Sequence, residues 1–268
     1  MSLFDFSQEE LLTFFAVMVR YSVLIAVLPF TGDRMVPAPA KILLALAVTI
    51  ALFPALVSSG QVKPGEAIGW ASSAAGIAGT VALEALLGFG LGYVARLTFD
   101  AIHFGSNLAG NFMGFASAST YDPHQESQTQ VVAEVQMALA MLLFLALDGH
   151  HLMLRAALDS YAIVGLGKAG ITGAYAQHLT ELTAQVLRFA ISLSAPIAAA
   201  LFAVNVAFGI MAKAMPQMNV LVLSFAASAF VGLAVMFLSV PELNAVSAGI
   251  FGRMDEWMGG ALAAMAGR

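Results

Sequence analysis

The sequence predicts an all-α membrane protein, and both its composition and its apolar runs support this fold class. Of the 268 residues, 60% are hydrophobic and only 10% are charged, whereas soluble domains carry roughly 25% charged residues. Too few polar side chains are present to cover the surface of a soluble fold of this length. The apolar residues form long runs without the alternation typical of strands, which indicates helices.

Composition and charge exclude several other classes. Lys and Arg number 11 against 16 Asp and Glu, and the net charge of -5 argues against a basic nucleic-acid binder. The chain has no cysteine, which rules out disulfides, thiolate metal sites and cysteine nucleophiles. The N-terminal segment is acidic, and its first positive charge, Arg20, lies inside an apolar run. This is not the pattern of a cleavable signal, so we expect the first helix to be retained.

Six apolar runs are expected to be helical, and three of them lie in the first part of the chain. Leu11–Phe30 follows Ser7 and Glu10, which form a capping box pattern. At about 1.5 Å per residue this run is roughly 30 Å long, enough to cross a bilayer. Ile42–Val57 is shorter and lies between two prolines, and Ala71–Val94 is again long enough to span.

The later runs are less uniform. Val131–Leu147 is marginal in length, Leu187–Met211 contains Pro196, and Val220–Val240 carries no charge. Lys and Arg are spread one or two per connection, so the positive-inside rule gives no simple up-and-down topology.

Small and charged residues form a ridge in the third run. They recur every fourth residue at Glu84, Gly88, Gly92, Arg96 and Asp100. The glycine pair would let another helix approach closely. Two interpretations stay open: a packing face whose carboxylate is satisfied by a neighbouring helix, or a proton or ion relay through Glu84.

Two arginines lie in apolar runs where contact with lipid would be costly. Arg20 is in the middle of the first run, and Arg188 opens the fifth. Each is expected to face protein or water, most simply in an ion pair. Glu84 and Asp148 are both possible partners.

No catalytic, cofactor or metal site is expected, and the chain is predicted not to be an enzyme. His150 and His151 are adjacent, so a helix would separate them by about 100° instead of placing both on one metal. No nucleophile-elbow motif is present.

The segment Gly110–Tyr121 combines small residues with bulky apolar ones. Its notable residues are Gly110, Phe112, Met113, Gly114 and Phe115. Exposed loops favour polar residues, so we expect a non-helical segment that is buried or plugs a cavity.

These motifs together resemble the FliR/SctT family of type III export-gate proteins. The resemblance rests on four groups of residues. The first two are Leu28-Pro29-Phe30-Thr31-Gly32 with Val36-Pro37 and Lys41, and Glu84-x3-Gly88-x-Gly90. The other two are Asp148-Gly149-His150-His151-Leu152, and Pro196, Asn205 and Gly209 followed by Pro216-Gln217-Met218-Asn219. The last group is the most specific. Lys213 stands where the family often has Arg, and Ala226-Ala227-Ser228 replaces a common Pro-Leu-Lys.

The resemblance implies a subunit of the flagellar protein export channel in the bacterial inner membrane, within the flagellar basal body. Residues 1–240 would form one helical domain of long, partly broken hairpins, with a FliP-like first part and a FliQ-like last part that meet near residue 180. With FliP-like and FliQ-like subunits it would build a helical, conical gate for unfolded polypeptides. Helix packing through Gly88 and Gly92, and through Asn205 and Gly209, is expected.

The resemblance also implies that residues 110–122 are a plug-like loop of the closed gate. The alternatives are an injectisome SctT-type export subunit and an autonomous secondary transporter. A transporter would place Glu84 and Arg96 near a midplane site and would show an internal repeat, and the sequence has no evident repeat.

Residues 241–268 are expected to form a separate amphipathic helix. Its apolar stripe comprises Leu243, Val246, Ile250, Met254, Trp257 and Ala261. Such a helix lies at a membrane interface or docks on a partner, and the resemblance implies an FlhB-like partner.

Overall fold

The computed structural model describes residues 7–28, 36–114, 130–170 and 172–267. These residues form helices and no strand, which confirms the predicted all-α class. Four helices are long and apolar enough to cross a membrane, namely α1 (Gln8–Val27), α3 (Ala38–Ser58), α5 (Ala74–Phe112) and α9 (Gly173–Ala214). The number rises to six if two bent helix pairs each count as one span.

The chain divides into two compact units, and the division does not follow sequence order. The first unit comprises residues 1–97, 150–182 and 253–268, and the second comprises residues 98–149 and 183–252. The long helices α5 and α9 therefore contribute to both units. The predicted boundary between the FliP-like and FliQ-like parts near residue 180 remains a prediction.

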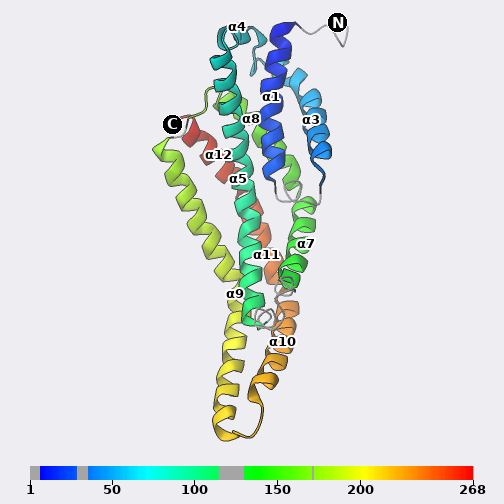
Figure 1. Ribbon diagram of the computed structural model, residues 1–268, viewed down its shortest axis with the longest axis vertical. Helices are drawn as coiled ribbons and strands as arrows, with labels where there is room; N and C mark the ends of the chain where they lie inside the picture. Colours follow the sequence, from blue (N-terminus) through cyan, green and yellow to red (C-terminus); the bar gives the residue numbers. More distant parts are fainter. Residues whose placement is uncertain (1–6, 29–35, 115–129, 171, 268) are drawn as a thin grey trace. The chain divides into compact units, whose positions relative to one another are not determined.

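In the first unit, α1 is the central helix. It packs against α3, against the short 3-10 helix η1 (Pro64–Glu66) and against α4 (Ala67–Trp70), and α3 runs beside it in Figure 1. Its buried residues are Thr13, Ala16, Val17, Arg20, Tyr21, Leu24 and Ile25. They recur at steps of three and four, so one stripe of the helix faces the interior.

The beginning of α1 is as predicted, but its end is not. The Glu10 amide donates to Ser7 Oγ at 3.2 Å and the Ser7 amide donates to Glu10 Oε2 at 2.9 Å, which confirms the capping box. The helix ends at Val27 and not at Phe30. Pro29 and Phe30, which carry part of the family resemblance, lie outside the described residues.

Two helices extend beyond their predicted limits. α3 contains Pro54 in its interior and spans 21 residues, so it is not the short run that its prolines suggested. α5 spans 39 residues and continues to Phe112, past the predicted end at Val94. The apolar run becomes polar after Val94, which is why the sequence predicted the end of the helix there. No proline interrupts the backbone hydrogen bonds after Val94, so the helix continues.

The second unit has an apolar core of side chains from several helices. Its contributing elements are the end of α5, α7 (Gln130–Ala146), the later part of α9, α10 (Val220–Leu238) and α11 (Val240–Gly252). One cluster of buried residues comprises Ala109, Met113, Val132, Ile197 and Leu201. A second contact joins the rings of Phe99, Phe144 and Phe251, whose centroids lie 5.0–5.2 Å apart.

The fifth predicted run is only part of its helix. α9 begins at Gly173, where the Thr172 hydroxyl accepts from the Tyr175 amide at 3.1 Å, and it spans 42 residues. Asp148 has φ 55°, and the chain turns there between α7 and α8 (Gly149–Ile163). Asn219 caps α10 by accepting from the Val222 amide at 3.5 Å.

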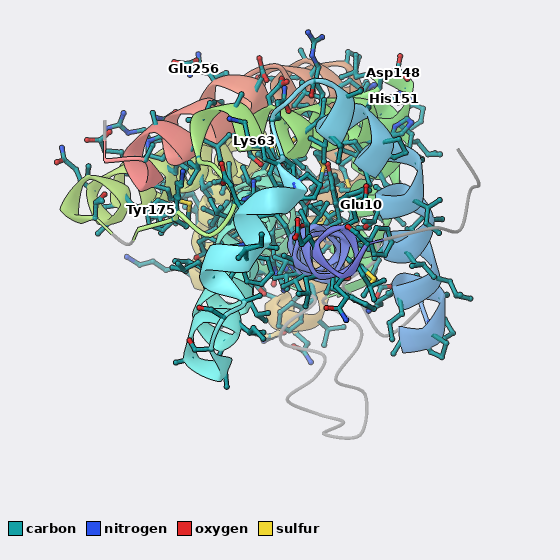
Figure 2. The ribbon with its side chains drawn as sticks, turned by 90° about the horizontal axis from the view of Figure 1, so that it is seen from above. Glu10, Lys63, Asp148, His151, Tyr175 and Glu256 are labelled. Carbon is teal, nitrogen blue, oxygen red and sulfur yellow. The ribbon has the colours of Figure 1, made fainter. Side chains whose placement is uncertain are left out.

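The C-terminal segment is two helices instead of one, and its apolar stripe is covered by the chain itself. α11 lies in the second unit and packs on α7, whereas α12 (Met254–Met265) lies in the first. In the first unit, His178 Nε2 lies 3.0 Å from the Trp257 carbonyl and the Thr172 hydroxyl donates to the Ala264 carbonyl at 2.7 Å. Glu256 of α12 is exposed and lies at the upper edge of the view in Figure 2.

Neighbouring glycines of α12 offer a test of this docking. A Cβ at Gly260 would lie 2.6 Å from the His178 ring, whereas a Cβ at Gly259 would have no neighbour within 4 Å. Gly259→Ala should stabilise the helix by up to about 1 kcal/mol. Gly260→Ala should instead lower the thermal unfolding midpoint of the detergent-purified chain, since overpacking typically costs ~1–3 kcal/mol. Equal effects of the two substitutions would contradict the described docking.

Candidate functional site: a buried ion pair and the residues around it

A fully buried ion pair joins α1 to α5 in the first unit. Arg20 Nε donates to Glu84 Oε2 at 2.6 Å, and Arg20 Nη2 donates to Glu84 Oε1 at 2.9 Å. Both side chains have no exposed surface. The planar guanidinium matches the carboxylate in a two-point contact, which is the strongest geometry for such a pair. Of the two partners considered for Arg20, the structure places Glu84 against it.

The same two side chains also form hydrogen bonds with α8 (Gly149–Ile163) and with the connection that follows it. Arg20 Nη1 donates to Ser160 Oγ at 2.7 Å, and the Gly167 amide donates to Glu84 Oε1 at 2.7 Å. Arg20 Cζ lies 3.6 Å from the centroid of the Tyr161 ring, within the range of a cation–π contact. Segments far apart in the sequence therefore meet at one charged centre, which we call the Arg20 cluster: Arg20, Glu84, Ser160, Tyr161 and Gly167.

Glycine lets the two helices come close enough for this pair. A Cβ at Gly88 would collide with the Arg20 carbonyl oxygen, and one at Gly92 would lie 2.9 Å from Val27 Cβ. The Gly88 and Gly92 positions thus face α1, one and two turns after Glu84. Because these two positions have no side chains, the backbones of α1 and α5 lie close enough for the Arg20 guanidinium to reach the Glu84 carboxylate.

The ridge predicted along α5 turns away from α1 after its second glycine. Arg96 is exposed, whereas Glu84, Gly88 and Gly92 are buried. Residues four apart drift by roughly 40° around a helix at each step, so a long row cannot stay on one face. Arg188 on α9 is also exposed.

The predicted gate segment begins inside α5. Gly110 and Phe112 are helical, and Phe112 is 45% exposed. Met113 is buried in the apolar cluster of the second unit, so its side chain packs in that core. Gly114 has φ 87° and faces the Phe225 ring. Phe115 lies outside the described residues.

The family motifs of the second unit are mostly exposed. Asn205 and Gly209 lie on an open face of α9, and a Cβ at Gly209 would have no neighbour within 4 Å. Within the described chain these two residues therefore do not mediate packing. Pro196 lies inside α9. Pro216 and Gln217 form the exposed turn that leads into α10.

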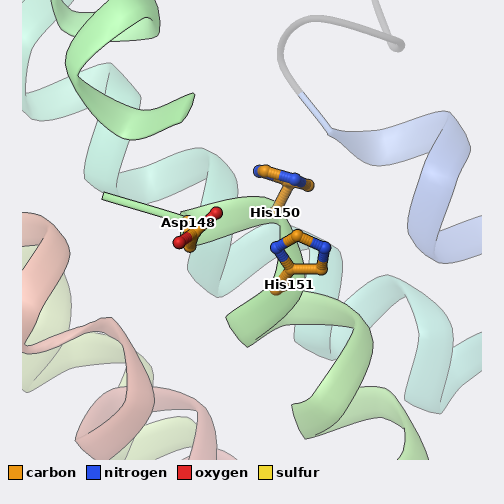
Figure 3. Close-up of side chains that lie close together, drawn as sticks. All are labelled: Asp148, His150 and His151. Atoms are coloured by element: carbon orange, nitrogen blue, oxygen red, sulfur yellow. The ribbon is translucent and has the colours of Figure 1, made fainter. Parts of the chain in front are cut away.

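The histidine pair is closer than its sequence spacing suggested. The rings of His150 and His151 have centroids 4.1 Å apart, and Figure 3 places them side by side at the start of α8, just after Asp148. One potential ligand atom from each of the three residues lies within 4.8 Å of the others. The two adjacent histidines and Asp148 thus lie closer together than helical spacing predicted. Two of the three, Asp148 and His151, have other interactions within the protein, and we assign no metal here.

Several residues of the site had no signal in the sequence. Ser160 and Tyr161 belong to no charged or glycine-rich pattern, and their role depends on folding that brings α8 against α1. Gly167 lies in the glycine-rich stretch 165–170, but that stretch does not indicate a contact with Glu84. The docking of His178 on α12 was likewise unexpected. Only its position on the same helical face as Tyr175 and Leu182 could have indicated a buried contact.

The fold and the buried pair define an α-helical membrane protein whose central charges hold helices together. Comparison with known families gives the narrower class. The sequence model of the family described as "Bacterial export proteins, family 1" matches residues 11–254, and the chain belongs to this family. This confirms the resemblance to the FliR/SctT family.

Individual relatives agree with this assignment. The flagellar biosynthetic protein FliR of Escherichia coli (strain K12) is 25% identical over 228 residues, which are 85% of this chain and 84% of the relative. The protein of the same name from Bacillus subtilis (strain 168) is 25% identical over 253 residues, covering 93% and 94% of the two chains. The one from Pectobacterium carotovorum subsp. carotovorum is 28% identical over 228 residues, covering 85% and 84%.

Two glycines of α5 test the close approach to α1. Gly88→Leu should prevent α5 from reaching α1, because the new side chain would meet the Arg20 backbone. Gly79→Leu is the matched control, since a Cβ at Gly79 would have no neighbour within 4 Å. We expect Gly88→Leu to reduce severely the yield of monodisperse chain in detergent, while Gly79→Leu leaves it near wild type. An unchanged yield for Gly88→Leu would refute this packing.

Proposed function

We propose that the chain is a non-enzymatic subunit of the flagellar type III protein export channel in the bacterial inner membrane. In this proposal it forms, with FliP-like and FliQ-like subunits, the gate through which unfolded flagellar proteins cross the membrane. Family membership and the names of the similar proteins support the flagellar export apparatus. The observation that carries the subunit role is the uncovered surface of α9 and α10.

The later part of α9 and α10 exposes large apolar side chains. Phe202 is 71% exposed, Phe230 76% and Phe237 78%. Most of the apolar part of α9 is not buried inside the chain. An apolar surface of this kind needs lipid or another protein to cover it.

Polar positions on this surface favour protein over lipid. The exposed Asn205 carries an amide that would be poorly solvated by hydrocarbon, and Gly209 one turn later would let another backbone approach. A neighbouring helix can supply both a hydrogen-bond partner and close packing. This combination supports a heteromeric assembly, in which the predicted packing through Asn205 and Gly209 would occur between subunits.

The geometry gives less support to an autonomous transporter. That hypothesis needs Glu84 and Arg96 near a substrate site, but both Glu84 oxygens accept hydrogen bonds from Arg20 and Gly167. A carboxylate held in this way is suited to joining helices and has little capacity left for a substrate or a proton relay. Between flagellar and injectisome export, the names of the similar proteins favour the flagellar system.

Co-purification tests the proposed assembly. The chain should elute from a detergent column in a stable complex with FliP-like and FliQ-like subunits from the same cells, and Asn205→Leu with Gly209→Leu should reduce that complex. Leu11→Ala is a control that should leave the complex intact, since Leu11 is an exposed apolar residue of α1 and does not lie on α9 or α10. A stable monomer that binds a small substrate would contradict the proposal and support the transporter.

The segment that begins at Gly110 is proposed as part of the closed gate. Bulky apolar residues such as Phe112 and Phe115 can narrow a lumen so that it excludes water and ions, while small neighbours leave the backbone free to move. Because Met113 is committed to the core of the second unit, Phe112 and Phe115 are the residues we expect to close the lumen.

Replacing these two rings tests the gate without disturbing the core residue Met113. The variant Phe112→Asn with Phe115→Asn should raise ion leak across the inner membrane when the complex assembles normally. Phe104→Asn is a matched control, because Phe104 lies on the same helix and is likewise 45% exposed. Normal assembly with a leak no greater than that of wild type would remove the segment from the gate.

A further inference from the structure

An apolar cavity lies in the first unit, between α1, α3 and α8. Its volume is ≈ 190 Å³. The described residues that line it are apolar apart from His150, and they include Leu24 on α1, Leu44 on α3 and Met153 on α8. An apolar cavity of about 150 Å³ excludes water but binds small hydrocarbons. The lining and size of this cavity therefore suit a hydrocarbon ligand.

The cavity continues into a more open groove between α3 and α8. This groove has a volume of ≈ 350 Å³ and shares Val48 and Leu154 with the cavity. Together they extend over residues 44–52 of α3 and 150–158 of α8, and we call the whole the α3–α8 groove. At 1.5 Å per residue each stretch is about 12 Å long. This is close to the hydrocarbon depth of one bilayer leaflet, which is roughly 15 Å.

The dimensions of the α3–α8 groove fit a hydrocarbon chain and not a helix. An α-helix with its side chains is about 10–12 Å wide, too wide for the enclosed cavity. The outer face of α3 is also apolar, with Leu43 64% exposed and Ile50 58% exposed. Since α1 and α3 are both long and apolar enough to span a membrane, the groove between them and α8 lies at the depth of lipid acyl chains.

Basic side chains flank the open part of the groove. His151 and Arg155 both line it and both are exposed, and no carboxylate lines it among the described residues. Arg155 Nε lies 3.8 Å from Asp159 Oδ2, and both side chains are more than half exposed, so this ion pair is weak. A phosphate can therefore compete for the guanidinium, which suits its geometry well.

The enclosed part contains a polar atom without a partner. His150, at the start of α8 in Figure 3, lines the cavity, and its Nδ1 atom is buried with no hydrogen-bond partner among the described residues. Leaving such an atom unpaired costs free energy. The ester carbonyl at the head of an acyl chain accepts a hydrogen bond from Nδ1 in the tautomer that carries its proton there.

We propose that the α3–α8 groove binds an anionic phospholipid. An acyl chain fills the cavity beside α1, its ester carbonyl accepts a hydrogen bond from His150, and the phosphate contacts His151 and Arg155 at the exposed rim. The lipid thereby fills the apolar space between α3 and α8, the helix that also carries Ser160 and Tyr161 of the Arg20 cluster. This binding does not depend on the proposed export role.

Photo-crosslinking in nanodiscs tests the site. The full-length chain, purified with the subunits that accompany it, is placed in bilayers that contain phosphatidylglycerol or phosphatidylcholine with the same photoreactive acyl chain. Labelled residues are then identified by mass spectrometry. Labelling of Val48, Met153 and Leu154 should saturate with lipid. Phosphatidylglycerol should label them roughly fivefold more than phosphatidylcholine, the ratio expected for one basic residue at an anionic lipid surface.

A pair of tryptophan variants tests whether the acyl chain occupies the groove. Val48→Trp should abolish labelling of Met153 and Leu154, because Val48 lines both parts of the groove and the larger ring fills the space. Ile50→Trp is the matched control, since Ile50 is exposed on α3 and does not line the groove. It should keep the labelling of wild type.

A pair of arginine variants tests the headgroup contact. Arg155→Gln should remove the preference for phosphatidylglycerol, whereas Arg188→Gln should keep it, because Arg188 is exposed and lies outside the groove. If Val48→Trp does not fold, the exposed Arg155 still provides the decisive variant. Equal labelling by the two lipids in wild type, or a preference that survives Arg155→Gln, would overturn the anionic lipid site. Labelling at Ile50 but not at Met153 would also overturn it, as expected if a partner subunit covers the groove.

Discussion

The ion pair between Arg20 and Glu84 is the interaction on which the first unit depends. Two opposite charges with no exposed surface are placed among apolar side chains. Desolvation makes either charge very costly alone, so each requires the other in good geometry. The pair therefore fixes the rotation of α1 and of α5 about their axes, and through Ser160 and Gly167 it also fixes α8 and the chain after it.

The glycines of α5 allow the close helix approach that the ion pair requires. Gly88 and Gly92 bring the helix backbones together next to the pair, and the apolar stripe of α1 packs on both sides of Arg20. A charged centre specifies a single register more strictly than apolar packing, because a shifted helix would leave a charge unpaired. We infer that the charges set which helices meet, whereas burial of apolar surface supplies the stability of the contact.

Much of this arrangement could be predicted from the sequence. Apolar periodicity indicated the helices, the Ser7–Glu10 pattern located the start of α1, and the cost of a buried arginine narrowed its partners to two. The prediction failed where polarity within a helix resembled an end, as after Val94 in α5 and before Leu187 in α9. It also failed where contacts join distant segments, since nothing local marks Ser160 or Tyr161 as neighbours of Arg20.

The C-terminal segment illustrates the same limit. Its apolar stripe was correctly identified, but periodicity gives the face of a helix and not what covers that face. The chain itself covers the stripe, because five of its six residues are buried: Leu243, Ile250, Met254, Trp257 and Ala261. By contrast, the surface of α9 and α10 has no cover within the described chain, and this difference separates internal packing from the surface that we assign to partner subunits.

A double-mutant cycle on Arg20 and Glu84 tests the central claim most directly. Arg20→Met and Glu84→Leu are made singly and together, and the free energy of unfolding of the purified chain is measured in detergent. Each single change leaves a buried charge unpaired and should cost about 3–5 kcal/mol, whereas the double change should cost much less than the sum. Additive losses would contradict the account, because they would mean that the two charges do not depend on each other.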